Sequence, residues 1–119
     1  MKPSTEPRHP ARGDIWLVNF NPGRGSEQRG IRPALIVQND VGNQFAATTI
    51  VAAITTTIKP YPVTVVVRGG TCGLPRESMV NLAQILTVDK ERLIRRLGRL
   101  TPELQAAVNR ALRISLALD

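Results

Sequence analysis

The chain has 119 residues, the size of a single domain, and 42% of them are hydrophobic, which is enough to bury a sizeable core. Sixteen Lys and Arg against nine Asp and Glu give a net charge of +7, and thirteen of these cations are arginine, which grips phosphate in a bidentate fork. The charge therefore favours a polyanion or an acidic protein as the partner. One cysteine excludes an internal disulfide, and Cys and His together are too few for a zinc site.

The first residues carry charges and prolines but lack the apolar segment of a secretory signal. We expect residues 1–11 to form a flexible tail and residues 12–119 to form one domain. No stretch approaches the roughly 18 apolar residues that a membrane span needs, so we expect no membrane partner and a cytoplasmic location.

The first half of the domain reads as strands joined by polar segments. Residues 13–20 carry apolar side chains on both faces, which predicts a largely buried strand. Residues 21–31 form a polar, glycine-rich loop, and a loop of this length is often functional. A second strand is expected over residues 32–38, a turn over 39–43, and a third strand over 48–54.

The second half continues the strands and ends in a helix. Strands are expected over residues 63–68, 78–82 and 84–87, then a brief helical turn over 90–93 and a strand over 94–100. Thr101-Pro102-Glu103 has the order of an N-cap, a first-turn proline and an early acid, and an amphipathic helix follows. We therefore expect a mostly antiparallel β-barrel or curled sheet, with the helix packed on the sheet or on a second subunit.

Three motifs in this order resemble the MazF/PemK toxins: RGDIW at 12–16, GSEQ at 25–28 and RPALIV at 32–37. The resemblance covers roughly residues 12–118. It implies an SH3-like, CcdB/PemK-type β-barrel with a C-terminal α-helix, working as a homodimer. It also implies an endoribonuclease that cleaves single-stranded RNA without a metal or other cofactor. The ribose 2′-OH would attack, leaving a 2′,3′-cyclic phosphate and a 5′-hydroxyl, and an acidic MazE-like antitoxin would neutralise the enzyme.

This chemistry needs a proton acceptor, charge stabilisation on the phosphoryl oxygens and a proton donor for the leaving oxygen. His9 is the only histidine and lies in the expected tail, so a mechanism based on two histidines is excluded. The resemblance assigns catalysis to Arg32 and Thr55. Arg32 would hold the scissile phosphate, because a guanidinium of pKa above about 12 is a poor acid or base. The Thr55 hydroxyl would contact a phosphate oxygen or the 2′-OH, or would merely cap a turn.

RNA contacts are expected mainly from the polar loop. Glu27 could accept the 2′-OH proton or be simply solvated, and Gln28 is suited to reading base edges. The arginines on either side would track phosphates or remain in solvent. The expected RNA-binding set is Arg24, Ser26, Glu27, Gln28, Arg29, Thr56 and Ser78, the last of which is as well explained by a structural hydrogen bond.

Three further features leave alternatives open. The cluster of Arg92, Arg95, Arg96 and Arg99 indicates a solvated basic face or a partner contact. Trp16 and Phe20 could stack on bases, but their apolar strand favours the core. The main rival function is a CcdB-like toxin that binds and poisons DNA gyrase without hydrolysis, and the RP position and the GSEQ loop favour the ribonuclease.

Overall fold

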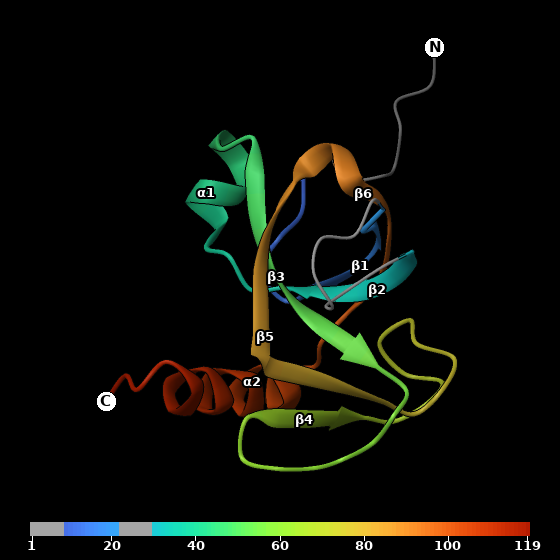
Figure 1. Ribbon diagram of the computed structural model, residues 1–119, viewed down its shortest axis with the longest axis vertical. Helices are drawn as coiled ribbons and strands as arrows, with labels where there is room; N and C mark the ends of the chain where they lie inside the picture. Colours follow the sequence, from blue (N-terminus) through green and yellow to red (C-terminus); the bar gives the residue numbers. More distant parts are fainter. Residues whose placement is uncertain (1–8, 22–29) are drawn as a thin grey trace.

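The computed structural model describes residues 9–21 and 30–119 and shows a curled antiparallel sheet with two α-helices (Figure 1). The strands are β1 (Asp14–Asn19), β2 (Ile31–Ile36), β3 (Thr48–Thr55), β4 (Thr64–Val67), β5 (Ser78–Asp89) and β6 (Leu93–Arg99). The helices are α1 (Asp40–Phe45), the short 3-10 helix η1 (Lys90–Arg92) and α2 (Pro102–Ser115). The mainly β class with a C-terminal helix is confirmed.

The sheet has the order β4-β5-β3-β2-β1-β6, so β4 and β6 are its edges. No hydrogen-bonded ladder joins β4 to β6. The loop after β4 reaches β6, where a Cβ on Gly73 would meet the carbonyl oxygen of Leu97, and one on Gly98 would meet that of Cys72. Gly73 also has φ +81, so the close approach and the backbone conformation both require glycine there.

The long strand β5 bends the sheet. Its residue Ile85 pairs with Ala52, whereas Asn81 pairs with the next residue of β3, Ala53. Residues 82–84 therefore have no counterpart in β3 and form a bulge, which increases twist and bends a strand. The expectation of two separate strands at 78–82 and 84–87 is wrong, because the bulge interrupts the alternation of side chains without ending the strand.

Each face of the sheet carries its own core. The face covered by α2, here called the helix face, has Ile15, Leu35, Ala52, Val65 and Val80 packed with Val108 and Ala111 of the helix. The opposite face, here called the Trp16 face, has a second cluster made of Trp16, Val18, Phe20, Ala34, Ile36, Val51 and Val88. Trp16 and Phe20 are thus core residues, and neither offers a stacking surface for bases.

The terminal helix α2 packs on β4 and β5, as the sequence pattern predicts (Figure 1). It begins where expected: the side chain of Thr101 accepts a hydrogen bond from the Leu104 amide at 3.2 Å, and Pro102 occupies the first turn. The Ser115 hydroxyl donates to the carbonyl oxygen of Leu82 at 2.7 Å, which fastens the end of the helix to the β5 bulge.

A short helix replaces the expected turn at 39–43. Asn39 caps α1 by accepting a hydrogen bond from the Gly42 amide at 2.8 Å. Asn43 is fully buried, and its side-chain oxygen accepts hydrogen bonds from Gln38 at 3.1 Å and from Thr49 at 2.7 Å. The turn prediction was wrong because tertiary hydrogen bonds, absent from any local signal, extend the capped turn into a helix.

Candidate active site

The two residues expected to be catalytic stand at the ends of neighbouring strands. Arg32 pairs with Val18 across β1 and β2, which sets its side chain on the Trp16 face, and it is exposed. The β2–β3 register ends with Ala34 paired to Ala53, and Thr55 follows two residues later on the face of Ala53, as Arg32 precedes Ala34 by two residues on the same face. Both side chains therefore lie on the Trp16 face, at the rim of its apolar cluster.

A proline explains why the β2–β3 ladder stops before this pair. Val37 donates its amide to Ile50, so alternate amides of β2 point toward β3. Pro33 holds the position where another such donor would fall, and proline has no N–H. Arg32 and Thr55 consequently lie beyond the last paired residues of β2 and β3, which leaves the strand ends open between them.

The Thr55 hydroxyl has a fixed role as an acceptor. Its Oγ1 accepts a hydrogen bond from the Thr57 amide at 3.1 Å, which is the turn-capping contact that the sequence left open. A hydroxyl has one donor and two acceptor sites, so this contact still leaves the proton available to a ligand. Thr55 is half-buried, whereas Thr56 is exposed on the turn that follows.

The backbone of Lys59, a residue that the sequence analysis did not single out, contacts the β5 partner of Thr55. Met79 is the β5 partner of Thr55, and its sulfur accepts a hydrogen bond from the Lys59 amide at 3.4 Å. The loop carrying Lys59 therefore crosses over Met79, and the lysine itself is exposed. Its only sequence signal is one basic residue shortly after the threonine run, which is too common a pattern to single out.

The residues flanking 22–29 are pinned by a network that starts on η1. The Arg92 guanidinium donates to the carbonyl oxygen of Asn19 at 3.1 Å and to that of Asn21. Two hydrogen bonds join the residues on the two sides of 22–29. The Phe20 amide donates to the Gly30 carbonyl oxygen at 2.8 Å, and the Gly30 amide donates to the side chain of Asn21 at 2.9 Å. Arg92 is thus a structural anchor at the end of β1.

The remaining predicted RNA-binding residues fall in two groups. Arg24, Ser26, Glu27, Gln28 and Arg29 lie outside the described residues. Ser78 is 3% exposed, pairs with Val67 on the helix face, and donates its hydroxyl to the carbonyl oxygen of Arg76 at 2.9 Å. This is the structural role that the sequence allowed, so Ser78 is left out of the RNA contacts proposed below.

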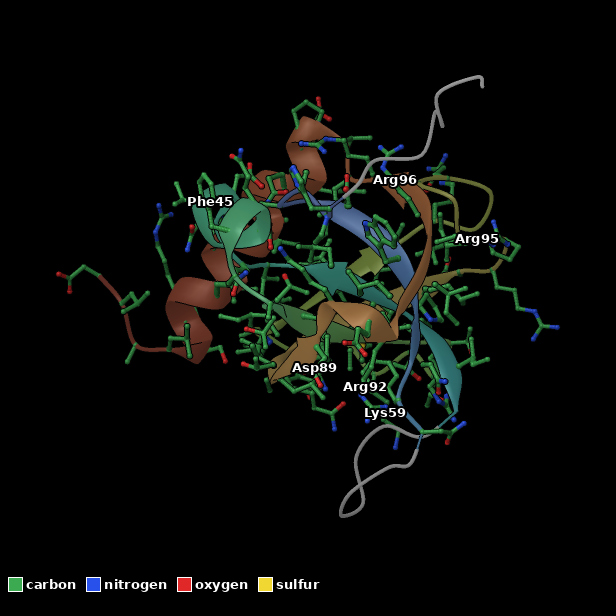
Figure 2. All side chains as sticks on the ribbon, turned by 90° about the horizontal axis from the view of Figure 1, so that it is seen from above. Phe45, Lys59, Asp89, Arg92, Arg95 and Arg96 are labelled. Carbon is green, nitrogen blue, oxygen red and sulfur yellow. The ribbon has the colours of Figure 1, made fainter. Side chains whose placement is uncertain are left out.

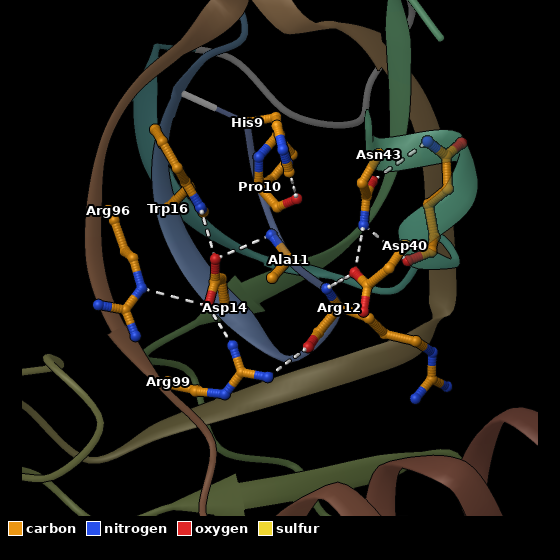
Figure 3. Close-up of polar contacts among 11 residues, drawn as sticks. His9, Pro10, Ala11, Arg12, Asp14, Trp16, Asp40, Asn43, Arg96 and Arg99 are labelled. Atoms are coloured by element: carbon orange, nitrogen blue, oxygen red, sulfur yellow. Dashed lines mark hydrogen bonds and ion pairs between the residues drawn. The ribbon is translucent and has the colours of Figure 1, made fainter. Parts of the chain in front are cut away.

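A buried carboxylate, which the sequence analysis did not single out, organises the opening motif (Figure 3). Asp14 is 2% exposed and accepts hydrogen bonds from the Ala11 amide at 2.9 Å and the Trp16 indole at 3.3 Å. It also accepts from two arginines of β6, Arg96 at 3.2 Å and Arg99 at 2.8 Å. No local sequence pattern marks this role, because the two arginine partners lie more than 80 residues away.

Arg12 extends this organisation to both helices. Its guanidinium donates to the Val37 carbonyl oxygen at 3.1 Å and to the Asn109 side chain on α2 at 2.9 Å. Its amide donates to Asp40 at 2.7 Å, and this contact, aided by the Asn43 amide, lowers the pKa of Asp40 below its ordinary 3.8. Ala11 and the buried Pro10 belong to this packed region, although the sequence assigned them to the tail.

The four arginines between residues 92 and 99, which the sequence grouped as a basic cluster, do not form one solvated face. Arg96 and Arg99 pair with Asp14, and Arg92 anchors the end of β1, so three of its members have structural partners. Figure 2 shows Arg92, Arg95 and Arg96 spread along one side of the molecule. Arg95 pairs with Leu17 and is exposed, which matches the solvated reading for that residue alone.

Residues 9–21 and 30–119 contain neither a candidate metal site nor a candidate membrane span. No cluster of three or more His, Cys, Asp or Glu side chains has the arrangement of a metal site there. None of the helices in these two ranges has the length and apolar character to cross a membrane.

The chain matches known proteins along nearly its full length. Residues 11–116 match the family described as the PemK-like, MazF-like toxin of type II toxin-antitoxin systems. The chain is 45% identical to endoribonuclease EndoA of Bacillus subtilis over 109 residues, covering 90% of this chain and 94% of that protein. It is 44% identical to endoribonuclease MazF of Staphylococcus saprophyticus over 109 residues, covering 90% and 91%.

Solved structures agree in fold. A mycobacterial endoribonuclease in complex with its cognate antitoxin is similar at TM-score 0.79 and 30% identity, over 92% of this chain and 97% of that chain. MazF of Deinococcus radiodurans is similar at TM-score 0.80 and 25% identity, over 93% and 99%. Sequence and fold thus confirm the resemblance carried by the RGDIW, GSEQ and RPALIV motifs, and the chain belongs to the PemK-like, MazF-like family of type II toxin–antitoxin toxins.

Proposed function

We propose that this toxin is an endoribonuclease that cleaves single-stranded RNA at short specific sequences, without a metal, by attack of the ribose 2′-OH. The products are a 2′,3′-cyclic phosphate and a 5′-hydroxyl. Endoribonuclease activity follows from the family and from relatives such as EndoA, which carry that activity in their names. The proposed chemistry is supported by one observation: the strand register puts Arg32 and Thr55 on one face of the sheet, at the ends of the neighbouring strands β2 and β3.

Arg32 stabilises charge on the phosphoryl group. Arg32 is exposed near the start of β2, and the residues that follow it in this strand are buried in the core. The strand therefore holds the backbone of Arg32 in a fixed position. Charge-assisted hydrogen bonds to phosphate oxygens strengthen as negative charge develops in the transition state. Arginine in this role supplies the stabilisation that a metal would otherwise provide, and it stays charged at every physiological pH.

Thr55 acts as a hydrogen-bond donor to the reacting group. The Thr57 amide occupies one acceptor site of Oγ1 and thereby restricts rotation of the hydroxyl. The proton is then directed to a phosphate oxygen or to the 2′-oxygen. Thr56, which is exposed beside it, also binds the RNA. So do five residues of the polar segment, Arg24, Ser26, Glu27, Gln28 and Arg29.

The partners follow from charge and exposed apolar surface. A net charge of +7 attracts an acidic antitoxin, and the mycobacterial relative was solved with its cognate antitoxin. A homodimer would bury apolar groups such as Phe45, which is 76% exposed on α1 and points outward in Figure 2. RNA, antitoxin and toxin would meet in the cytoplasm.

The test is cleavage of a mixed single-stranded RNA by the purified protein in EDTA. Wild type should cut, and the products should carry 2′,3′-cyclic phosphate ends. Arg32→Ala should lose at least about 100-fold in rate, the scale for one oxyanion-stabilising donor, and remain folded. Arg32→Lys, the matched control, keeps the charge without the bidentate fork and should recover part of the rate.

Two outcomes would refute this function. An Arg32→Ala variant as active as wild type would remove the arginine from the chemistry. A wild-type protein that leaves every RNA intact and stalls DNA gyrase would make the CcdB-like reading correct instead.

A further inference from the structure

One polar side chain on the Trp16 face of the sheet is not accounted for by the catalytic pair. Asn81 of β5 pairs with Ala53 of β3 on one side and with Thr64 of β4 on the other. Paired residues share a face, so Asn81 lies on the same face as Arg32 and Thr55. Since Thr55 pairs with Met79, Asn81 is its diagonal neighbour, about 7–8 Å away between backbones.

The orientation of the Asn81 amide is fixed by the β5 bulge. Its Oδ1 accepts a hydrogen bond from the Ala83 amide at 3.0 Å, two residues along the chain. A backbone N–H can only donate, so the atom facing it must be the oxygen and the NH₂ group must point elsewhere. Asn81 is half-buried, and this bond holds its NH₂ group as a directed hydrogen-bond donor.

The neighbours of Asn81 make a surface suited to a nucleobase. The Thr64 hydroxyl is already engaged, since it donates to the Tyr61 carbonyl oxygen at 2.7 Å and accepts from the Tyr61 amide at 2.9 Å. Val66, the β4 partner of Met79, is 38% exposed on the same face and supplies an apolar contact. The Asn81 NH₂ group could therefore donate to the edge of a base while Val66 contacts the face of the same base. Both lie close to Thr55.

We propose that Asn81 reads one base next to the scissile phosphate by donating its NH₂ group to an acceptor on that base. Carbonyl oxygens and unprotonated ring nitrogens of bases are such acceptors, whereas an exocyclic amino group presented at the same position is rejected. Val66 packs against the base beside it. This inference rests on the proposed RNA cleavage. It makes Asn81 of β5 one of the residues that set which RNA sequences the enzyme cuts.

The experiment compares cleavage of a random-sequence RNA pool, read by sequencing the product ends. Asn81→Asp keeps an oxygen for the Ala83 amide but replaces the outward donor with an acceptor. Asn81→Ser is neutral and short, and its hydroxyl can still hold the bulge. Gln44→Ser, which alters an exposed amide on α1, is the matched control. Thermal melting checks that each variant is folded.

Both Asn81 variants should lower the preference for the favoured base at one position by about fivefold or more, the effect of one lost hydrogen bond. Asn81→Asp should shift that position toward bases with an amino group, and Gln44→Ser should cut as wild type does. Unchanged base preference in both Asn81 variants, with or without a uniform loss of rate, would overturn this inference alone. Wild-type protein that cuts no RNA would overturn the proposed function as well.

Discussion

Replacing Asp14 by alanine should destabilise the fold while leaving the proposed catalytic residues, Arg32 and Thr55, in place. The carboxylate is 2% exposed and receives four donors, of which Arg96 and Arg99 have side chains that are 36% and 51% exposed. These two arginines can return to water, so their pairs contribute only about 0.5–1 kcal/mol each. The indole N–H of the buried Trp16 and the Ala11 amide would lose their acceptor, at about 1–3 kcal/mol together after partial rehydration.

The sum is a loss of about 2–5 kcal/mol in the free energy of unfolding. Urea denaturation followed by tryptophan fluorescence measures it directly, because Trp16 is the only tryptophan and contacts the carboxylate. Asp14→Asn, which keeps one acceptor oxygen of the same shape, should lose clearly less. A change below about 0.5 kcal/mol in Asp14→Ala would refute the reasoning, because that is the range of an ordinary surface substitution.

Three further outcomes are expected. Arg92→Met should raise the KM for an RNA oligonucleotide by about fivefold or more, with a smaller change in kcat, because the carbonyl oxygens of Asn19 and Asn21 lose a hydrogen-bond donor. Arg92→Lys should recover part of the lost affinity. An unchanged KM in Arg92→Met would contradict the anchoring role of Arg92. The folded pKa of Asp40 is lowered, so its contribution to stability is complete above the unfolded value near 3.8 and disappears as the pH falls through the folded value. Urea titrations from pH 5 to pH 3 should therefore show a smaller acid-induced loss for Asp40→Asn than for wild type, and equal losses would count against the shift. Thr101→Ala should cost about 1 kcal/mol of stability through loss of the α2 cap, whereas Thr101→Ser should cost little, both measured by urea denaturation.

Much of the fold could be predicted from local patterns. Alternating apolar residues located the buried strand β1, and the Thr101-Pro102-Glu103 signal located the start of α2. Local patterns failed at α1 and at β5. The helix α1 depends on the buried side chain of Asn43. The strand β5 continues through a bulge in which the Asn81 side chain accepts a hydrogen bond from the Ala83 amide. The Asn43 contact reaches Thr49 of β3, and Ser115 of α2 donates to Leu82 within the bulge, so both features also involve other elements, which local propensity does not contain.

Some features of the candidate site could likewise be predicted from the sequence, and others could not. The sequence by itself determined the family, and it identified Arg32 and Thr55 as residues whose chemistry suits RNA cleavage. Only the tertiary structure decided that these two share one face at the ends of neighbouring strands and that Arg92 holds the end of β1, some 70 residues earlier in the chain. The physical reason is strand register: pairing across the sheet sets which side chains share a face. The register is fixed by the packing of both cores, by the bulge that interrupts the β3–β5 ladder and by the proline that ends the β2–β3 ladder.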